Sequence, residues 1–227
     1  MENFKKSGLP ETADYYSSMY RAKICRRFLS PGRCLELGPA WGNMTIHLVD
    51  YFKEMVCVEG SSIMCEYLRQ KLPQVKVIQC LFEEFDTNEK FDAIILAHVL
   101  EHVDEPVKIL KKVKKWLKKN GKIFASCPNA RSLHRQLGVI LGILKNEGDL
   151  NETDLKIGHK RVYTPESFRG DFIEAELKIE YFGGYWIKIH PNREIENFYS
   201  EEMLKACMVL GERYPDIAAE IYIIASL

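Results

Sequence analysis

The chain has 227 residues, a length at which one α/β domain with an insertion is the default interpretation. Lysine plus arginine and aspartate plus glutamate both number 32, so the formal net charge is zero and favours no polyanionic partner such as nucleic acid. Because the seven cysteines form no C-x-x-C pair and no run reaches the about 18 apolar residues of a membrane span, we expect a cytoplasmic protein with reduced thiols and no membrane partner.

The predicted elements start with a helix over residues 12–29, which is rich in aromatic and basic side chains and ends at Pro31-Gly32. From there on, segments typical of strands and of helices alternate. Strands are predicted at residues 33–37, 55–59, 75–80, 91–98 and 122–127, and helices at residues 43–52, 63–72 and 106–119. The apolar run Ala93-Ile94-Ile95-Leu96 is typical of a parallel strand that is buried on both faces. The alternation predicts a doubly wound α/β fold.

After Pro128 the pattern changes. Helices are predicted at residues 132–144, 165–175 and 201–212, strands at residues 177–182 and 218–226, and a polar, acidic stretch at residues 146–160. We predict a single domain, residues 1–227, with an N-terminal helical cap at residues 1–30. Residues 129–165 are expected to form an insert over the carboxyl edge of the sheet, where ligands of such folds bind.

The stretch ELGPAWGNM follows the first predicted strand. Gly38 and Gly42 allow backbone amides to approach a ligand closely, and the predicted helix after them adds free N–H groups and a favourable dipole. A dinucleotide fingerprint, G-x-G-x-x-G, does not fit, because its third glycine would fall at Asn43. Glu36, at the entrance to the loop, suits a ligand that carries an ammonium group.

Five stretches in order resemble the motifs of class I S-adenosylmethionine-dependent methyltransferases. They are CLELGPAWGNMT, VCVEGS, CLFEEF, FDAIILAHVLEHV and WLKKNGKIFASCPN, within residues 33–129. The resemblance implies a Rossmann-like, seven-stranded, mostly parallel sheet in the order 3-2-1-4-5-7-6, with the last strand antiparallel. It also implies S-adenosylmethionine as the cofactor.

The resemblance implies a role for each matching residue. Glu59, at the end of the second strand, would bridge the ribose hydroxyls, and Ala40 replaces the usual middle glycine. Leu81 stands where many members carry an aspartate that contacts adenine, so this contact would fall to groups near Leu81, Phe82 and Glu83, with plain packing of the apolar pair as the alternative. Tyr16 would close over the cofactor or pack along its helix. The implied cofactor-binding set is Glu36, Gly38, Ala40, Gly42, Glu59, Gly60, Leu81, Phe82, Ala97, His98 and Tyr16.

Methyl transfer from a sulfonium asks the protein to align the acceptor and to remove a proton from it. Histidine suits proton removal near neutral pH, and the candidates are His98, His134 and His159. A metal site made of Glu101, His98 and His102 is an alternative use of these groups. Since adjacent residues rarely converge on an ion without further ligands, we predict no metal.

Two later stretches, PNARSLHRQLG and GHKRVYTPESF, resemble a bacterial small-molecule subgroup, and Glu101-His102-Val103 resembles the ubiquinone-biosynthesis type. In that subgroup the two stretches flank the acceptor, which implies that it is contacted by Asn129, His134, Arg135, Arg161 and Tyr163, with His159 beside them. Arginine suits capture of a carboxylate or phosphate. The alternative for both arginines is ion pairing with the acidic residues 147–154.

The sequence therefore predicts an enzyme that methylates an oxygen or a nitrogen of a small metabolite. The alternatives are a methyltransferase acting on a peptide or another macromolecule, a Rossmann-type NAD or nucleotide-sugar enzyme, and a binding protein without turnover. The neutral charge speaks against the first of these and the glycine spacing against the second. A monomer and a homodimer stay equally open.

Overall fold

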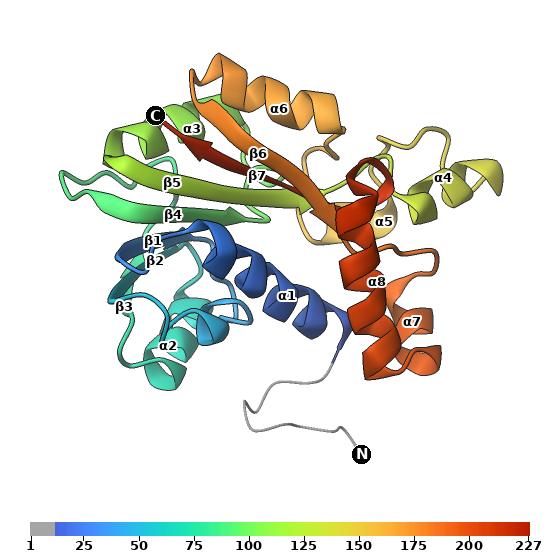
Figure 1. Ribbon diagram of the computed structural model, residues 1–227, viewed down its shortest axis with the longest axis horizontal. Coiled ribbons are helices and arrows are strands. Elements are labelled where there is room, and N and C mark those ends of the chain that lie inside the picture. Colours follow the sequence, from blue (N-terminus) through green and yellow to red (C-terminus); the bar gives the residue numbers. More distant parts are fainter. Residues whose placement is uncertain (1–11) are drawn as a thin grey trace.

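The computed structural model describes residues 12–227, and seven strands form one sheet in the order β3-β2-β1-β4-β5-β7-β6 (Figure 1). β7 runs antiparallel to both of its neighbours, and every other pair of neighbouring strands is parallel. This order and this antiparallel strand confirm the predicted fold class. The strands are β1 Arg33–Leu37, β2 Glu54–Glu59, β3 Lys76–Gln79, β4 Phe91–Ala97, β5 Leu117–Pro128, β6 Lys178–Tyr185 and β7 Glu220–Ser226.

Helices cover both faces of the sheet (Figure 1). They are α1 Ala13–Phe28, α2 Ser62–Lys71, α3 Pro106–Trp116, α4 Leu133–Ile140, α5 Glu152–Lys156, α6 Pro165–Glu174, α7 Asn192–Phe198 and α8 Glu201–Arg213, with short 3-10 turns η1 Thr45–His47 and η2 Pro215–Ile217. Within residues 12–227 no helix combines the length and the apolar character that a membrane crossing requires. Residues 1–11 of the predicted cap lie outside the described residues, and the rest of the cap contains α1.

Two apolar cores lie on opposite faces of the sheet because successive side chains of a strand point to opposite sides. In β1, Cys34 belongs to the core under α1, α7 and α8, and Leu35 belongs to the core under α3 and α6. Ala93 and Ile94 divide β4 in the same way. Burial on both faces is what the unbroken apolar runs predict for a parallel sheet.

The segment at residues 43–52, predicted as a helix, forms turns and the short η1 instead. Its β-branched and short polar side chains lower helix propensity. The position of a covering helix is taken by α1, whose Tyr15 ring lies 5.4 Å from the His47 ring and whose Arg26 donates to the His47 carbonyl. The prediction of a helix dipole beside the glycine loop is therefore wrong.

Other boundaries also differ from the prediction. β5 begins at Leu117, so α3 is shorter than expected, and the register slips between Phe91 and Ala93 where the two strands meet. The polar stretch at residues 146–160 contains α5, whose capping box at Asn151 starts a helix without an apolar pattern. α7 was also not predicted. The insert, with α4 and α5, lies beyond the carboxyl end of β5 (Figure 1).

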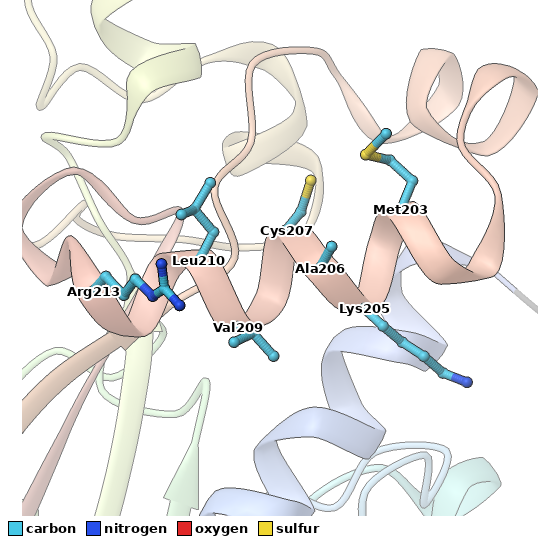
Figure 2. A pocket seen from close by; sticks show the side chains of 7 residues that line it. All are labelled: Met203, Lys205, Ala206, Cys207, Val209, Leu210 and Arg213. Atoms are coloured by element: carbon cyan, nitrogen blue, oxygen red, sulfur yellow. The ribbon is translucent and has the colours of Figure 1, made fainter.

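The outer face of α8 carries a groove, whose lining side chains are shown in Figure 2. They are Met203, Lys205, Ala206, Cys207, Val209, Leu210 and Arg213. All seven come from this one helix, and none follows a strand at the carboxyl edge of the sheet. The groove is therefore separate from the residues that the motifs single out.

Candidate active site

The loop after β1 folds around three residues with left-handed backbone angles. The φ angles of Gly38, Ala40 and Gly42 are 66°, 49° and 75°. For alanine this conformation costs about 1–2 kcal/mol, so the surroundings must hold it. The Gly38 N–H donates to the Val58 carbonyl at 2.9 Å, which ties the loop to β2.

Glu59, the last residue of β2, holds the loop from the other side. Its Oε2 accepts the backbone N–H of Ala40 at 3.2 Å, and its Oε1 accepts that of Ser61 at 2.8 Å. Each carboxylate oxygen keeps a lone pair that no backbone amide uses. Glu59, the residue predicted to bind the ribose, therefore contacts the predicted glycine loop. Its contact with the ribose stays a prediction.

Leu81 and Phe82 form a wall beside the same loop. A Cβ atom built on Gly38 would lie 3.2 Å from Phe82 Cζ, and one built on Gly60 would lie 3.1 Å from Leu81 Cδ2. Leu81 is 54% exposed, whereas Phe82 is partly buried against the α3 side of the sheet. Gly38 thus lies close to Phe82 and Gly60 close to Leu81, and their contact with adenine stays a prediction.

Glu36 lies under the loop and is 2% exposed. Its Oε2 accepts a hydrogen bond from Thr45 Oγ1 at 2.8 Å and a weaker one from Cys57 Sγ at 3.6 Å. Burial raises the pKa of Glu36 to about 7, although both hydrogen bonds act to lower it. This carboxyl group is poised to lose a proton when a cation approaches it.

His98 follows β4 with a left-handed φ of 57°. Its Nε2 lies 2.8 Å from Glu220 Oε2, and its Nδ1 lies 3.2 Å from Glu101 Oε1. Burial lowers the pKa of His98, but the charge of Glu220 and the contacts with both carboxylates outweigh it and raise the pKa to about 9. In this arrangement the ring is a cation at neutral pH rather than a free base.

Three charged residues around His98 were not predicted. Glu220 opens β7, and burial raises its pKa, while the charges of His98, Arg21 and Lys188 outweigh that effect and lower it. Arg21, on α1, is buried and donates to Ser18 Oγ at 3.2 Å. The available signal was an acidic residue inside the apolar run AAEIYIIAS and an arginine among the aromatic residues of the first helix.

His134, another predicted catalytic histidine, lies on α4. Burial, together with the charges of Lys188 and Arg135, lowers its pKa to about 3. Its Nδ1 is buried and has no hydrogen-bond partner among residues 12–227. The ring is therefore neutral and a weak base, and its catalytic role stays a prediction.

Two predicted acceptor contacts are occupied within the protein. Asn129 Nδ2 donates to the carbonyls of Asp216 and Ala218 at 3.0 and 2.9 Å. The Tyr163 hydroxyl donates to Asp171 Oδ2 at 2.6 Å, and burial together with this bond raises the pKa of Tyr163. Asn129 thus binds the backbone that leads into β7, and Tyr163 binds a side chain of α6.

Both predicted arginines also bind protein groups. Arg135 is buried and contacts Asp154 Oδ2 at 3.1 Å, which matches the alternative of ion pairing with the acidic stretch, although the pair is buried rather than on the surface. Arg161 Nη1 donates to the carbonyls of Leu100 and Val103 at 3.0 and 2.7 Å. Contact of either arginine with an acceptor stays a prediction.

Three further predicted residues, His159, Tyr16 and Ala97, are buried or partly buried. His159 is buried, with its Nδ1 3.2 Å from Asp154 Oδ1. Tyr16 is 5% exposed in the core under α1, with its ring 5.7 Å from the Tyr15 ring. Ala97, the last residue of β4, is partly buried and faces β5. Their contacts with a ligand stay predictions.

A family model described as a methyltransferase domain matches residues 13–181. An uncharacterized methyltransferase of Alkaliphilus oremlandii is 28% identical over 94 residues, which are 40% of this chain and 44% of the relative. The (S)-coclaurine N-methyltransferase of Papaver somniferum is 29% identical over 97 residues, which are 40% of this chain and 28% of the relative. The chain thus spans less than half the length of these curated relatives.

The fold is similar to solved structures. The crystal structure of a SAM dependent methyltransferase from Archaeoglobus fulgidus superposes with a TM-score of 0.63 at 16% identity, covering 94% of each chain. At this identity the likeness concerns the fold alone, and it agrees with the strand order described above.

Proposed function

The chain belongs to the methyltransferase-domain family, and from this premise we propose that it uses S-adenosylmethionine to methylate an oxygen or a nitrogen of a small molecule. This family membership displaces the NAD and nucleotide-sugar alternatives. A peptide or another macromolecule stays the alternative acceptor, and the formal charge of zero favours the small molecule over a nucleic acid.

The observation that carries the proposal is the contact between the glycine loop and Glu59. Ala40 donates its N–H to Glu59 Oε2, so the carboxylate and the left-handed loop are positioned together. The lone pairs left on Glu59 suit the two hydroxyls of a ribose, and Leu81 and Phe82 offer an apolar wall for adenine. Glu36 beneath the loop suits the ammonium group of the methionine part.

We place the acceptor end at Glu220, which pairs with His98 and is acted on by the charges of Arg21 and Lys188. Methyl transfer is an in-line displacement, so these groups would orient the acceptor rather than form bonds to it. The charges of His98, Arg21 and Lys188 lower the pKa of Glu220. Glu220 is therefore a carboxylate, which can accept hydrogen bonds from an amine or a hydroxyl of the acceptor. A relative named for N-methylation of coclaurine supports nitrogen as one acceptor atom.

Calorimetric titration tests the cofactor directly. S-adenosylmethionine, S-adenosylhomocysteine and NAD are titrated in parallel into the full chain. We expect both adenosyl ligands to bind with micromolar dissociation constants and NAD not to bind. Binding of NAD alone, or of none of the three, would overturn the proposal.

Removal of the Glu59 carboxylate tests the carrying observation. In Glu59→Ala the loop loses its support and the ribose loses a charge-assisted partner, so S-adenosylmethionine should bind more weakly by about 1.5–3 kcal/mol. Glu66→Ala, on the exposed surface of α2, is the matched control and should bind as the unmodified chain does. Equal affinity of Glu59→Ala and the unmodified chain would show that the ribose assignment is wrong.

We also infer a cytoplasmic location. All seven cysteines are free, and five of them, Cys25, Cys34, Cys57, Cys65 and Cys127, are buried. Reduced buried thiols are typical of reducing compartments.

A further inference from the structure

A second group of chemically capable side chains lies next to the acceptor end. Glu101 and His102 follow β4, and His159 comes from the insert after α5. One ligand atom of each lies within 4.8 Å of the other two. Ligand atoms bound to a common zinc ion at about 2.0–2.2 Å lie roughly 3.3 Å apart, so small side-chain rotations would close the site.

Glu101 is the member that most needs a partner. Its side chain is fully buried, and neither of its oxygens accepts a well-directed hydrogen bond from residues 12–227. Within residues 12–227 its Oε1 pairs with His98 Nδ1 at 3.2 Å, and its Oε2 has no partner. Burying an ionised carboxylate costs several kcal/mol unless charges and hydrogen bonds compensate it. The His98 cation compensates the charge at Oε1, and a metal ion between Glu101 and the two other side chains would compensate it at Oε2.

His159 is held as metal-binding histidines usually are. Its Nδ1 lies 3.2 Å from Asp154 Oδ1, which leaves Nε2 for a ligand. Asp154 is itself fixed by Arg135 Nη1 at 3.1 Å and by the backbone N–H of Asn151 at 3.0 Å. A carboxylate behind a histidine fixes its tautomer and its direction and strengthens it as a ligand.

The backbone keeps the two ligand-bearing segments together without any ion. The Lys160 N–H donates to the Glu101 carbonyl at 2.8 Å, and Arg161 binds the carbonyls of Leu100 and Val103. The rings of His102 and His159 meet edge to face with their centroids 4.7 Å apart. The insert is thus fastened to the loop after β4, and the three side chains are preorganised.

We propose that Glu101, His102 and His159 bind one divalent transition-metal ion, with zinc the best match to two imidazoles and a carboxylate. Three protein ligands leave a coordination position for water or for a donor atom of a small molecule. The prediction of no metal considered only neighbouring residues, whereas the third ligand comes from the insert. The site uses no residue of the glycine loop and stands independently of the cofactor assignment.

Metal binding by the full chain is the first test. The protein is stripped with a chelator, and zinc is titrated against a chromophoric chelator, with elemental analysis of the product. We expect one ion per chain in the unmodified protein, and affinity weaker by about 100-fold or more in Glu101→Gln and His159→Ala. His190→Ala removes an exposed histidine that pairs with Glu194, and this control should bind zinc normally.

Asp154→Asn tests the supporting carboxylate, and it should weaken zinc binding roughly 10- to 100-fold while leaving one ion per chain. Circular dichroism and thermal unfolding of the metal-free variants show whether each is folded. An unmodified chain that binds no zinc overturns the proposal whatever the variants do, as does a folded His159→Ala that binds like the unmodified chain. Titration of S-adenosylmethionine into the same metal-free protein separates failure of this site from failure of the proposed function.

Discussion

At the scale of the residue, the candidate site depends on side chains and backbone angles that are costly in isolation. Ala40 adopts a left-handed conformation and is held by a hydrogen bond to Glu59, while Glu36 is a buried acid and His98 a buried cation. Groups of this kind persist only where the surroundings determine them, and they concentrate at functional sites.

Gly38→Val should abolish binding of S-adenosylmethionine. The φ of Gly38 is 66°, and a Cβ there would lie 3.1 Å from Val99 Cγ2 and 3.2 Å from Phe82 Cζ. Gly142→Val is a matched control, because Gly142 has a φ of 72° but no atom within 4 Å of a Cβ. Both variants should lose about 1–2 kcal/mol of unfolding free energy, and only Gly38→Val should lose binding by calorimetry. A Gly38→Val that binds the cofactor normally would contradict the site.

Glu36 should make the protein less stable as the pH rises. Its pKa is raised from an ordinary value of 4.5 to about 7, so between these values the native state holds more protons than the unfolded state. The free energy of unfolding therefore falls with rising pH across this window, by roughly 3 kcal/mol from this group. The free energy of unfolding is measured with urea near pH 5 and near pH 8. Relative to the unmodified chain, Glu36→Gln should be more stable at pH 8 than it is at pH 5.

The control for that comparison is Glu66→Gln, on the exposed surface of α2, whose stability should follow the unmodified chain at both pH values. A constant difference between Glu36→Gln and the unmodified chain across the window would refute the raised pKa.

At the scale of the element, patterns of apolar residues placed the strands well and the helix ends less well. α3 follows its amphipathic pattern, whereas the segment after the glycine loop is short and is covered by α1 instead of forming its own helix. α8 packs so closely on the end of β6 that its backbone accepts hydrogen bonds from the chain there. The Trp186 N–H donates to Met208 and the Ile187 N–H to Cys207, at 3.2 and 2.8 Å.

Gly211→Ala should disrupt this contact. A Cβ on Gly211 would overlap the backbone of Tyr185 and Trp186, which cannot rotate away as a side chain can. We expect a loss of about 1–3 kcal/mol in unfolding free energy, measured by urea denaturation. Gly170→Ala in α6 is the matched control, since it meets nothing within 4 Å and should gain about 0.5–1 kcal/mol from helix propensity. Equal effects of the two substitutions would argue against the close packing of α8.

At the scale of the whole molecule, two cores on opposite faces of one sheet support a row of loops at its carboxyl edge. The candidate residues come from α1, the loops after β1, β2 and β4, the start of β7 and the insert. A ligand that contacts several of these segments should stabilise the fold as a unit, because it binds the native state only.

S-adenosylmethionine at about 100 times its dissociation constant should add about 2.7 kcal/mol to the free energy of unfolding. For a chain of this length that corresponds to a rise in Tm of roughly 5–10 °C, measured by scanning calorimetry. NAD at the same concentration should leave the Tm unchanged, and Gly38→Val should show no rise with either ligand. A Tm that does not respond to S-adenosylmethionine would contradict the proposed function.

Local sequence patterns were enough to predict the strands, the glycine loop and the acidic residue that ends the second strand. These follow from local information: apolar runs in strands, glycine spacing and the order of motifs along the chain. Gly38 and Gly42 lie in the loop after the first strand and Glu59 ends the second, and the ends of parallel strands meet at one edge of the sheet.

Only the tertiary structure decided which distant side chains meet. Glu220 pairs with His98, and Arg135 pairs with Asp154. Glu101 and His159 are 58 residues apart in sequence and are brought together by the path of the insert, which no local pattern specifies. Charge pairing depends on distance in space and on burial, and neither quantity is encoded in the local pattern of residues.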